Sequence, residues 1–323
     1  MKITIHTPQA IWQLGKRRNQ EDALYPTPGT ATADDRLFIV CDGMGGHEKG
    51  EVASAAVCRG MSQALGDVLV ENELLSDFCF DDAIEQAYDA LDSADTGHEG
   101  RMGTTMTCLC LHKGGCLAAH IGDSRIYHIR PRKRQILYRS RDHSLVQHLY
   151  ELGEISYNDM ATSPRRNIIT RVMQPYQQVR TKPTVVYITD LQPDDYLLLL
   201  SDGMLEQMDD AELLDILCSK GTDEEKAAFL QEATQQNADN HSAYIIRIKN
   251  VKHERSDRHL PSTEKKEREQ NKALNDTRRD LAWSLYTDTL DTQRLADEAT
   301  TADGRQQKKQ LTFLKWLSSL AKP

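Results

Sequence analysis

Apolar and polar residues follow the patterns of a folded domain over the first 250 residues of the chain. Strand-like apolar runs cover residues 36–41, 104–111, 116–121, 125–130, 135–138, 196–200 and 243–249. Helical periodicity covers residues 51–65 and 81–91, between the first two of these runs. Strands that cluster apart from the helices favour an α+β fold over a wound parallel sheet.

Short links join several of the expected strands. Gly114-Gly115, Gly122-Asp123 and Pro131-Arg132 each separate two strand-like runs. Glycine and proline at such positions are typical of tight turns, so we expect antiparallel hairpins at all three links.

The pattern changes near residue 250. Residues 251–282 are dense in charge and nearly free of aliphatic side chains, as in a solvated linker or an extended helix. Near the end, Phe313, Trp316, Leu317 and Leu320 follow a helical stripe flanked by lysines. We therefore predict a folded domain over residues 1–250 and a charged, partly helical tail over 251–323, which docks on a partner or folds back.

Composition narrows the function. The chain has 323 residues, is 39% hydrophobic and carries a formal net charge of −9, which argues against a nucleic-acid-binding surface. Its seven cysteines form no Cys-x-x-Cys pair, so we expect reduced thiols rather than a disulfide framework or a zinc site. The sequence shows no signal-peptide stretch and no membrane span. We expect a cytoplasmic protein.

An acidic residue followed by glycine recurs at the ends of apolar runs. Asp42 follows residues 38–41 and precedes three glycines within four residues, and Asp202-Gly203 follows residues 196–200. The glycine-rich stretch after Asp42 lacks the Gly-Lys-Ser/Thr of a phosphate-binding loop. Asp42 is therefore either a metal ligand or a residue that caps the turn.

Further acids stand near other strands: Asp123 directly after one, Asp239 just before the last, and Glu21-Asp22 near the start. Carboxylates that met at one rim of a sheet would repel one another unless cations lay between them. Oxygen ligands without histidine or cysteine spacing favour Mg²⁺ or Mn²⁺ over zinc.

These segments together resemble a known family, the PP2C-type metal-dependent serine/threonine phosphatases, and its bacterial members in particular. The matching stretches, in order, are RRNQEDALY, FIVCDGMGGHEKGEVAS, GTTMTCLCL, AHIGDSRIY, RDHSLVQHLYELGEI, NIITRVM, LLLLSDGM and DNHSAYIIRI. They span about residues 10–249. The resemblance implies two antiparallel sheets in a sandwich flanked by helices (α-β-β-α).

The resemblance also implies roles for individual residues. Asp42 would bridge two metal ions, Mn²⁺ or Mg²⁺; the carbonyl of Gly43 would bind one ion, and Asp202 and Asp239 the other. Asp123 matches the acid that supports a third ion, and Glu21 and Asp22 match acids that hold metal-bound waters. Arg17 matches the arginine that binds the substrate phosphate, for which a guanidinium is well suited. Arg18 is the alternative candidate for this phosphate-binding arginine.

The match has departures. Met44 stands where eukaryotic members carry a histidine proposed as general acid, so the proton donor is unassigned, and His47 is interpreted as a turn residue. Asp142 is expected to be a turn or hydrogen-bonding residue, and Asn240 to orient Asp239 or the next turn. Residues 144–175 match a mobile flap in which Arg165 and Arg166 either meet a phosphorylated substrate or are simply solvated.

The predicted function is hydrolysis of phosphoserine and phosphothreonine in proteins by a metal-activated water. The alternative is a non-catalytic phosphoprotein-binding regulator, or an adaptor that acts through its tail. Loss of a core aspartate would mark such a regulator, and Asp42, Asp202 and Asp239 are all present. The expected partners are phosphorylated proteins, with a cognate serine/threonine kinase as a candidate.

Overall fold

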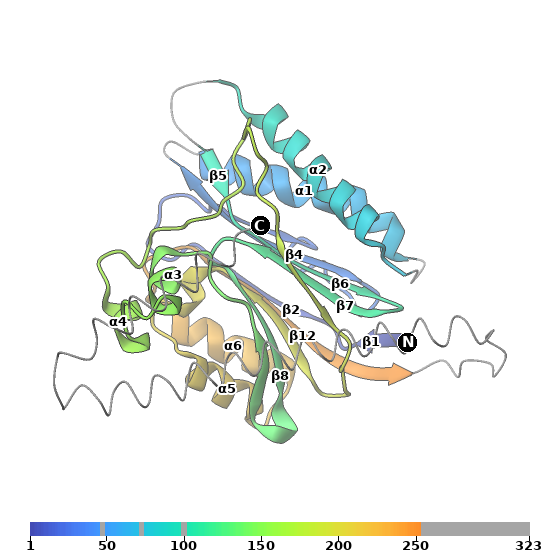
Figure 1. Cartoon of the computed structure of the whole chain (residues 1–323). Coiled ribbons are helices and arrows are strands. Elements are labelled where there is room, and N and C mark those ends of the chain that lie inside the picture. The colour runs from blue at the N-terminus through green and yellow to red at the C-terminus, as the bar shows by residue number, and fades with distance from the viewer. Residues whose placement is uncertain (46–48, 71–73, 98–101, 253–323) are drawn as a thin grey trace, which may run out of the picture. The chain divides into compact units, whose positions relative to one another are not determined.

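A computed structural model describes residues 1–45, 49–70, 74–97 and 102–252. Within these ranges the chain forms two six-stranded antiparallel sheets. The sheets stack face to face, with helices on their outer sides (Figure 1). The predicted α-β-β-α sandwich is confirmed.

The first sheet has the strand order β10-β7-β6-β4-β3, and β5 pairs with the end of β4. Its strands are β3 (Asp22–Tyr25), β4 (Leu37–Gly45), β5 (Met102–Thr104), β6 (Met106–His112), β7 (Gly115–Ile121) and β10 (Thr184–Ile188). Helices α1 (Lys49–Val70) and α2 (Asp77–Ala94) cover its outer face (Figure 1).

The second sheet has the order β1-β12-β11-β8-β9, and β2 also pairs with β12. Its strands are β1 (Lys2–Ile5), β2 (Gln9–Gln13), β8 (Arg125–Arg130), β9 (Gln135–Arg139), β11 (Tyr196–Leu200) and β12 (His241–Lys252). Helices α5 (Asp210–Cys218) and α6 (Asp223–Thr234) pack on it. The short helices α3 (Leu145–Glu151) and α4 (Tyr157–Thr162) lie in the link from β9 to β10, and the 3₁₀ turns η1 (Pro131–Lys133) and η2 (Asp202–Leu205) follow β8 and β11.

The apolar runs of the central strands are buried on both faces. In β4, Phe38 and Val40 pack between the sheets, whereas Leu37, Ile39 and Cys41 pack under α1 and α2. β11 alternates likewise: Leu197 and Leu199 face the first sheet, and its other residues face α5 and α6. Because neighbouring side chains point to opposite faces of a strand, one apolar run serves two cores.

One predicted hairpin is wrong. β6 and β7 pair across Gly114-Gly115, and β8 and β9 pair across the Pro131 turn, as expected. β7 and β8, however, belong to different sheets. At Gly122 the backbone has φ +104°, a left-handed conformation that suits glycine, and the chain crosses from one sheet to the other there. Asp123 therefore lies between the sheets.

All seven cysteines are free thiols, and five of them are buried. Across the helices that the structure describes, none is long and apolar enough to cross a bilayer.

Candidate active site

Five aspartates from both sheets gather at one end of the sandwich. Asp22 on β3 lies directly opposite Asp42 on β4 in the strand register. Asp123 follows β7, Asp202 follows β11, and Asp239 precedes β12. These carboxyl groups lie close enough to raise one another's pKa values.

Asp42 lies at the centre of this group. Burial raises its pKa well above the usual range, and the charges of Asp22, Asp202 and Asp123 raise it further. A hydrogen bond between the carboxyl groups of Asp42 and Asp202 also raises the pKa of Asp42 and lowers that of Asp202. The backbone around Asp42 is fixed, because its N–H donates to Thr105 Oγ1 (3.0 Å) and its carbonyl accepts from Thr104 Oγ1 (2.9 Å).

Asp22 and Asp123 are buried carboxylates with unused acceptor atoms. Burial, together with the charges of Asp202 and Asp239, raises the pKa of Asp22 to about 7. Burial likewise raises the pKa of Asp123 to about 8, with Asp202 as the next cause. Asp22 Oδ2 accepts from Ser201 Oγ (2.9 Å), but Oδ1 of both aspartates is buried without a partner among the described residues.

Asp202 and Asp239 form the more open side of the group. Asp202 keeps solvent-accessible surface, yet the protein atoms packed around it raise its pKa, and the charge of Asp239 adds to this. Asp239 accepts from Arg17 Nη2 at 2.6 Å, in an ion pair whose side chains are 52% and 38% exposed. Arg17 therefore lies at the site, on Asp239.

Asn240 ties the segment that carries Arg17 to the acids. Its Nδ2 donates to the carbonyls of Leu14 (2.8 Å) and Asn19 (3.1 Å), and its Oδ1 accepts from Glu21 N–H (2.9 Å). Its own N–H donates to Asp239 Oδ1 (2.8 Å). The interpretation of Asn240 as an orienting residue thus agrees with contacts on both sides of the site.

Glu21 lies at the edge of the site, and partial burial raises its pKa while Arg17 opposes the shift. Its carbonyl accepts from Gly43 N–H (3.1 Å) and Ser54 Oγ (2.5 Å). Glu21 therefore connects the Arg17 segment, β4 and α1 through its backbone.

Gly43 is a point of close backbone contact. A Cβ added there would lie 2.0 Å from Gly50 O and 2.6 Å from Glu21 O, and both are backbone atoms that cannot rotate away. The start of α1 thus packs directly on the strand that carries Asp42, and only glycine fits.

We expect Gly43→Ala to destabilise the domain by roughly 1–3 kcal/mol, because β4 or α1 must shift to relieve the clash. Hydrolysis should fall as well, since Asp42 is the adjacent residue. Gly66→Ala is the matched control: Gly66 lies in α1, and its added Cβ would find its nearest atom 4.0 Å away, at Tyr25 Oη. This variant should be neutral or stabilised by up to about 1 kcal/mol. Urea titration of both variants checks the difference, and equal stability would contradict the steric argument.

The donor set fits hard divalent cations. Two buried, unpartnered carboxylate oxygens and several raised pKa values indicate a site that lacks positive charge. Among the described residues, no three acidic, histidine or cysteine side chains converge closely enough to form a complete metal site by themselves. Mg²⁺ and Mn²⁺ tolerate this, because they keep several water ligands.

Of the remaining predicted residues, Asp142 and Met44 border this group, the arginines are exposed, and the others lie outside the described residues. Asp142 accepts two hydrogen bonds from the Arg125 guanidinium (2.7 Å each), so it is an ion-pairing residue, as expected. Arg165 and Arg166 are exposed. Arg18 is exposed near Arg17, and Met44 pairs with Gly103 next to Asp42. His47 and the tail stripe lie outside the described residues.

Several polar residues of the site were not predicted. Ser201 bonds Asp22, Ser242 N–H donates to Ser201 Oγ (2.9 Å), and Thr105 Oγ1 bonds both Asp42 N–H and Ser124 Oγ. Serine and threonine beside a strand carry no pattern that separates these roles from ordinary turn bonding. Ser201 and Ser124 stand directly beside the predicted acids Asp202 and Asp123, which is a signal in the sequence, whereas Thr105 and Ser242 stand beside no acid.

Comparisons with known proteins agree with this geometry. The sequence model of the protein phosphatase 2C family matches residues 15–240. The serine/threonine phosphatase Stp of Listeria welshimeri is 31% identical over 219 residues, which cover 67% of this chain and 85% of that protein.

Solved structures agree as well. The serine/threonine phosphatase PstP/Ppp of Mycobacterium tuberculosis superposes with a TM-score of 0.64 at 27% identity, covering 77% of this chain and all of that one. The catalytic domain of the phosphatase PstP in complex with two manganese ions superposes with a TM-score of 0.62 at 26% identity, with the same coverage. The chain belongs to the protein phosphatase 2C family and is a metal-dependent serine/threonine protein phosphatase.

Proposed function

We propose that the acid-lined end of the sandwich hydrolyses phosphoserine and phosphothreonine in protein substrates, with Mn²⁺ or Mg²⁺ held by the aspartates. Asp42 and the carbonyl of Gly43 would hold one ion, and Asp42, Asp202 and Asp239 a second; Asp123 would support a third. The observation that carries the proposal is the unpartnered, buried carboxylate oxygen on each of Asp22 and Asp123, within one interacting group of acids.

The residues of the site would then have distinct tasks. Bound divalent cations supply positive charge that stabilises phosphoryl oxygens and lowers the pKa of a water. Asp22, hydrogen-bonded to Ser201, and Glu21 would orient waters around the ions. Asn240 holds the Arg17 segment against Asp239, and this sets the direction from which a phosphate would meet the guanidinium.

Metal removal tests the activity directly. Hydrolysis of a phosphothreonine peptide should be undetectable after treatment with a chelator and should return on addition of Mn²⁺ or Mg²⁺. The added cations restore the positive charge that offsets the repulsion between the carboxylates. Titration with each ion separately identifies which one the site prefers. Full activity in a chelator would contradict the proposal.

Arg17 has two candidate anions: Asp239, which it contacts here, and the substrate phosphate. We propose that it leaves Asp239 for the phosphate when a cation binds Asp239. Both side chains are partly exposed to solvent, so the ion pair contributes at most about 1 kcal/mol and separates readily.

Arg17→Ala should therefore raise KM for a phosphopeptide about tenfold or more, while Mn²⁺ binding stays equal or becomes tighter. Tighter metal binding follows because the guanidinium no longer competes for Asp239. Arg18→Ala is the control, since Arg18 is exposed in the same segment. Calorimetric Mn²⁺ titrations and steady-state kinetics measure the two effects separately. Unchanged KM in Arg17→Ala would remove this residue from the phosphate site.

Four further proposals concern the whole chain. We propose that the catalytic domain ends after Lys252 rather than at residue 250, because β12 continues to Lys252 and pairs there with Lys2. Residues 253–323 lie outside the described part, and we propose that they dock on a partner or fold back. A cytoplasmic location and a cognate kinase as partner also remain proposals, supported by the free thiols and by the expected phosphoprotein substrates.

A further inference from the structure

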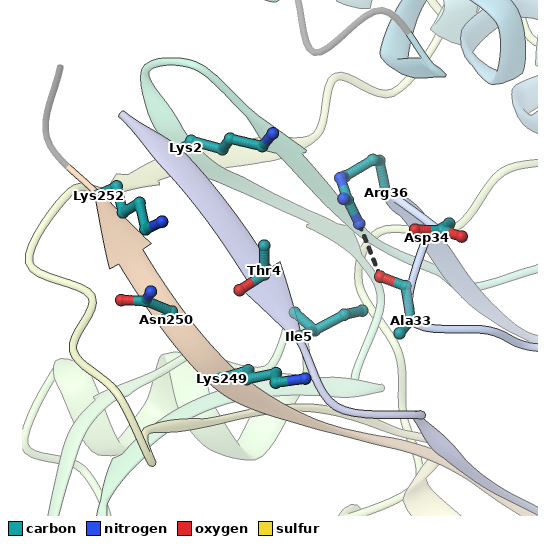
Figure 2. Close-up of a pocket in the computed structure, with 9 residues that line it drawn as sticks. All are labelled: Lys2, Thr4, Ile5, Ala33, Asp34, Arg36, Lys249, Asn250 and Lys252. Carbon is teal, nitrogen blue, oxygen red and sulfur yellow. Dashed lines mark hydrogen bonds between the residues drawn. The ribbon is translucent and has the colours of Figure 1, made fainter.

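A basic groove lies on the second sheet at the strand ends remote from the acids. It has a volume of about 560 Å³ and is lined by β1, the end of β12 and the segment that precedes β4 (Figure 2). Four of its nine lining residues are cationic, Lys2, Arg36, Lys249 and Lys252, and Asp34 is its one acid. It is thus a positive surface on a chain of net charge −9.

The positive charge of the groove is not neutralised within the described chain. Lys2 and Lys252 lie directly opposite each other in the strand register, where like charges are unfavourable. Among the described residues, Arg36 Nη1 donates to the carbonyls of Ala33 (3.1 Å) and Asp35 (2.8 Å) and to no carboxylate, so no ion pair compensates its charge. An anionic ligand would relieve this repulsion.

The shape of the groove suits an extended chain. β1 ends the strand order of its sheet and pairs with β12 alone among the described strands. Thr4 and Asn250, opposite each other, add polar side chains between the lysines. Figure 2 shows β1 between the β12 residues and Ala33–Arg36. An edge strand lined by spaced cations fits an extended peptide with alternating anionic side chains.

β4 runs from the groove to the acids, so its length gives the distance between them. Arg36 immediately precedes β4, and Asp42 is six residues further along this chain segment. At about 3.3 Å per residue, the two lie roughly 20 Å apart. A peptide of ordinary length can therefore reach both places.

We propose that this groove binds an extended, polyanionic segment of the protein substrate, carrying carboxylates or further phosphates, while a phosphoserine or phosphothreonine of the same substrate lies at the acids. This inference rests on the proposed function. Docking at the groove raises the effective concentration of the phosphorylated residue at the acids. It therefore selects phosphoproteins that carry a second anionic segment. The favoured ligand is protein rather than nucleic acid, because the basic surface is small and the whole chain is acidic.

The test replaces three exposed lysines of the groove: Lys2→Gln, Lys249→Gln and Lys252→Gln together in the full chain. The matched control replaces Lys133, Lys182 and Lys220 by Gln, which removes the same charge from exposed positions elsewhere. Arg36 stays, because its hydrogen bonds hold the preceding turn.

Binding is measured first, in a chelator, so that no hydrolysis occurs. The probe is a fluorescein-labelled ten-residue peptide in which serine alternates with glutamate, and a second peptide carries phosphoserine in place of glutamate. A single-stranded oligonucleotide of equal charge is the third probe. At low salt, the groove variant should bind both peptides about tenfold more weakly than the wild type, while the control variant should not.

Catalysis is measured second, with Mn²⁺ present. The substrates carry phosphothreonine joined by a six- to eight-residue spacer to either an acidic or a neutral segment. The groove variant should lose about tenfold in kcat/KM on the acidic substrate only, with p-nitrophenyl phosphate hydrolysis unchanged.

The outcomes separate the docking proposal from the proposed function. Equal peptide binding by the wild type and the groove variant overturns the docking proposal. So does equal weakening in the control, or binding of the oligonucleotide in preference to both peptides. Absence of phosphothreonine hydrolysis by the wild type would overturn the proposed function alone, since the chelator experiment still reports on the groove.

Discussion

Asp42→Asn is expected to lower kcat for a phosphothreonine peptide by at least three orders of magnitude and, in the absence of metal, to make the protein more stable. The first effect follows because Asp42 would contact both ions, so that its charge cannot be supplied by another residue. The second follows because Asp42 is held among Asp22, Asp202 and Asp123, whose charges repel its ionised form. Asparagine keeps the shape of the side chain and removes the charge.

The opposite signs of the two effects make this experiment informative. A misfolded variant would lose activity and stability together, whereas removal of a strained catalytic group should lower activity and raise stability. For a domain of this size, each kcal/mol gained raises Tm by about 2–4 °C. The control is Asp67→Asn, an exposed position on α1. Near wild-type turnover of Asp42→Asn with Mn²⁺ would show that the ions do not depend on Asp42.

The fold was predictable where one strand carries a long apolar run. The bounds of β8 and β11 match the prediction residue for residue, because both strands are central and buried on both faces. β1, β2, β3 and β10 were not predicted. These strands are only four or five residues long, and β1, β2 and β10 pair with strands distant in sequence, as β1 does with β12. Local periodicity carries little signal for such strands.

Asp123, Asp202 and Asp239 were predictable because each stands near the end or start of a predicted strand. Asp42 lies within β4, which continues to Gly45 instead of ending at Cys41 as expected. The arrangement of the acids was not predictable. The turn at Gly122 looks like a hairpin in sequence, since a glycine followed by aspartate between two apolar runs is a common hairpin signal. In the structure the chain changes sheets there, which brings Asp123 towards Asp42. The choice between pairing and crossing depends on which sheet has room for β8, and this is a property of the whole fold.

The hydrogen bonds that hold the site together were its least predictable feature. Asn240 bonds the carbonyl of Leu14, 226 residues away in sequence, and Ser201 bonds Asp22, 179 residues away. Such contacts exist only once β2, β3, β11 and β12 have been brought together. Sequence therefore indicates which residues can carry the chemistry, whereas the tertiary structure decides which residues hold them in place.

The stability of the metal-free protein should fall as pH rises from 6.5 to 8. In the folded chain the pKa of Asp22 is about 7 and that of Asp123 about 8, both far above the value near 3.8 that an unfolded chain shows. At any pH between 3.8 and the folded pKa of the group, the folded state keeps a proton that the unfolded state has lost. Stability from such groups is complete at low pH and is lost as pH rises through the folded pKa, at about 1.4 kcal/mol per pH unit for each group that still holds its proton.

The lower limit of the window is set by the buried histidines. Burial lowers the pKa of His120 and His143, so they favour the folded state increasingly as pH rises towards 6.5 and oppose the effect of the aspartates there. Above pH 6.5 an unfolded histidine is itself mostly neutral, and the aspartates determine the slope. We therefore expect Tm in a chelator to fall by on the order of 5–10 °C between pH 6.5 and 8.

Saturating Mn²⁺ should remove this slope, because a bound cation favours the ionised carboxylates and leaves no protons to be lost over the same range. Thermal unfolding at several pH values, with chelator and with Mn²⁺, measures both slopes. The double variant Asp22→Asn and Asp123→Asn should flatten the chelator curve, and Asp67→Asn should leave it unchanged. A Tm that stays constant or rises with pH in the chelator would mean that Asp22 and Asp123 are already ionised at pH 6.5, and the argument that this site lacks positive charge would then fail.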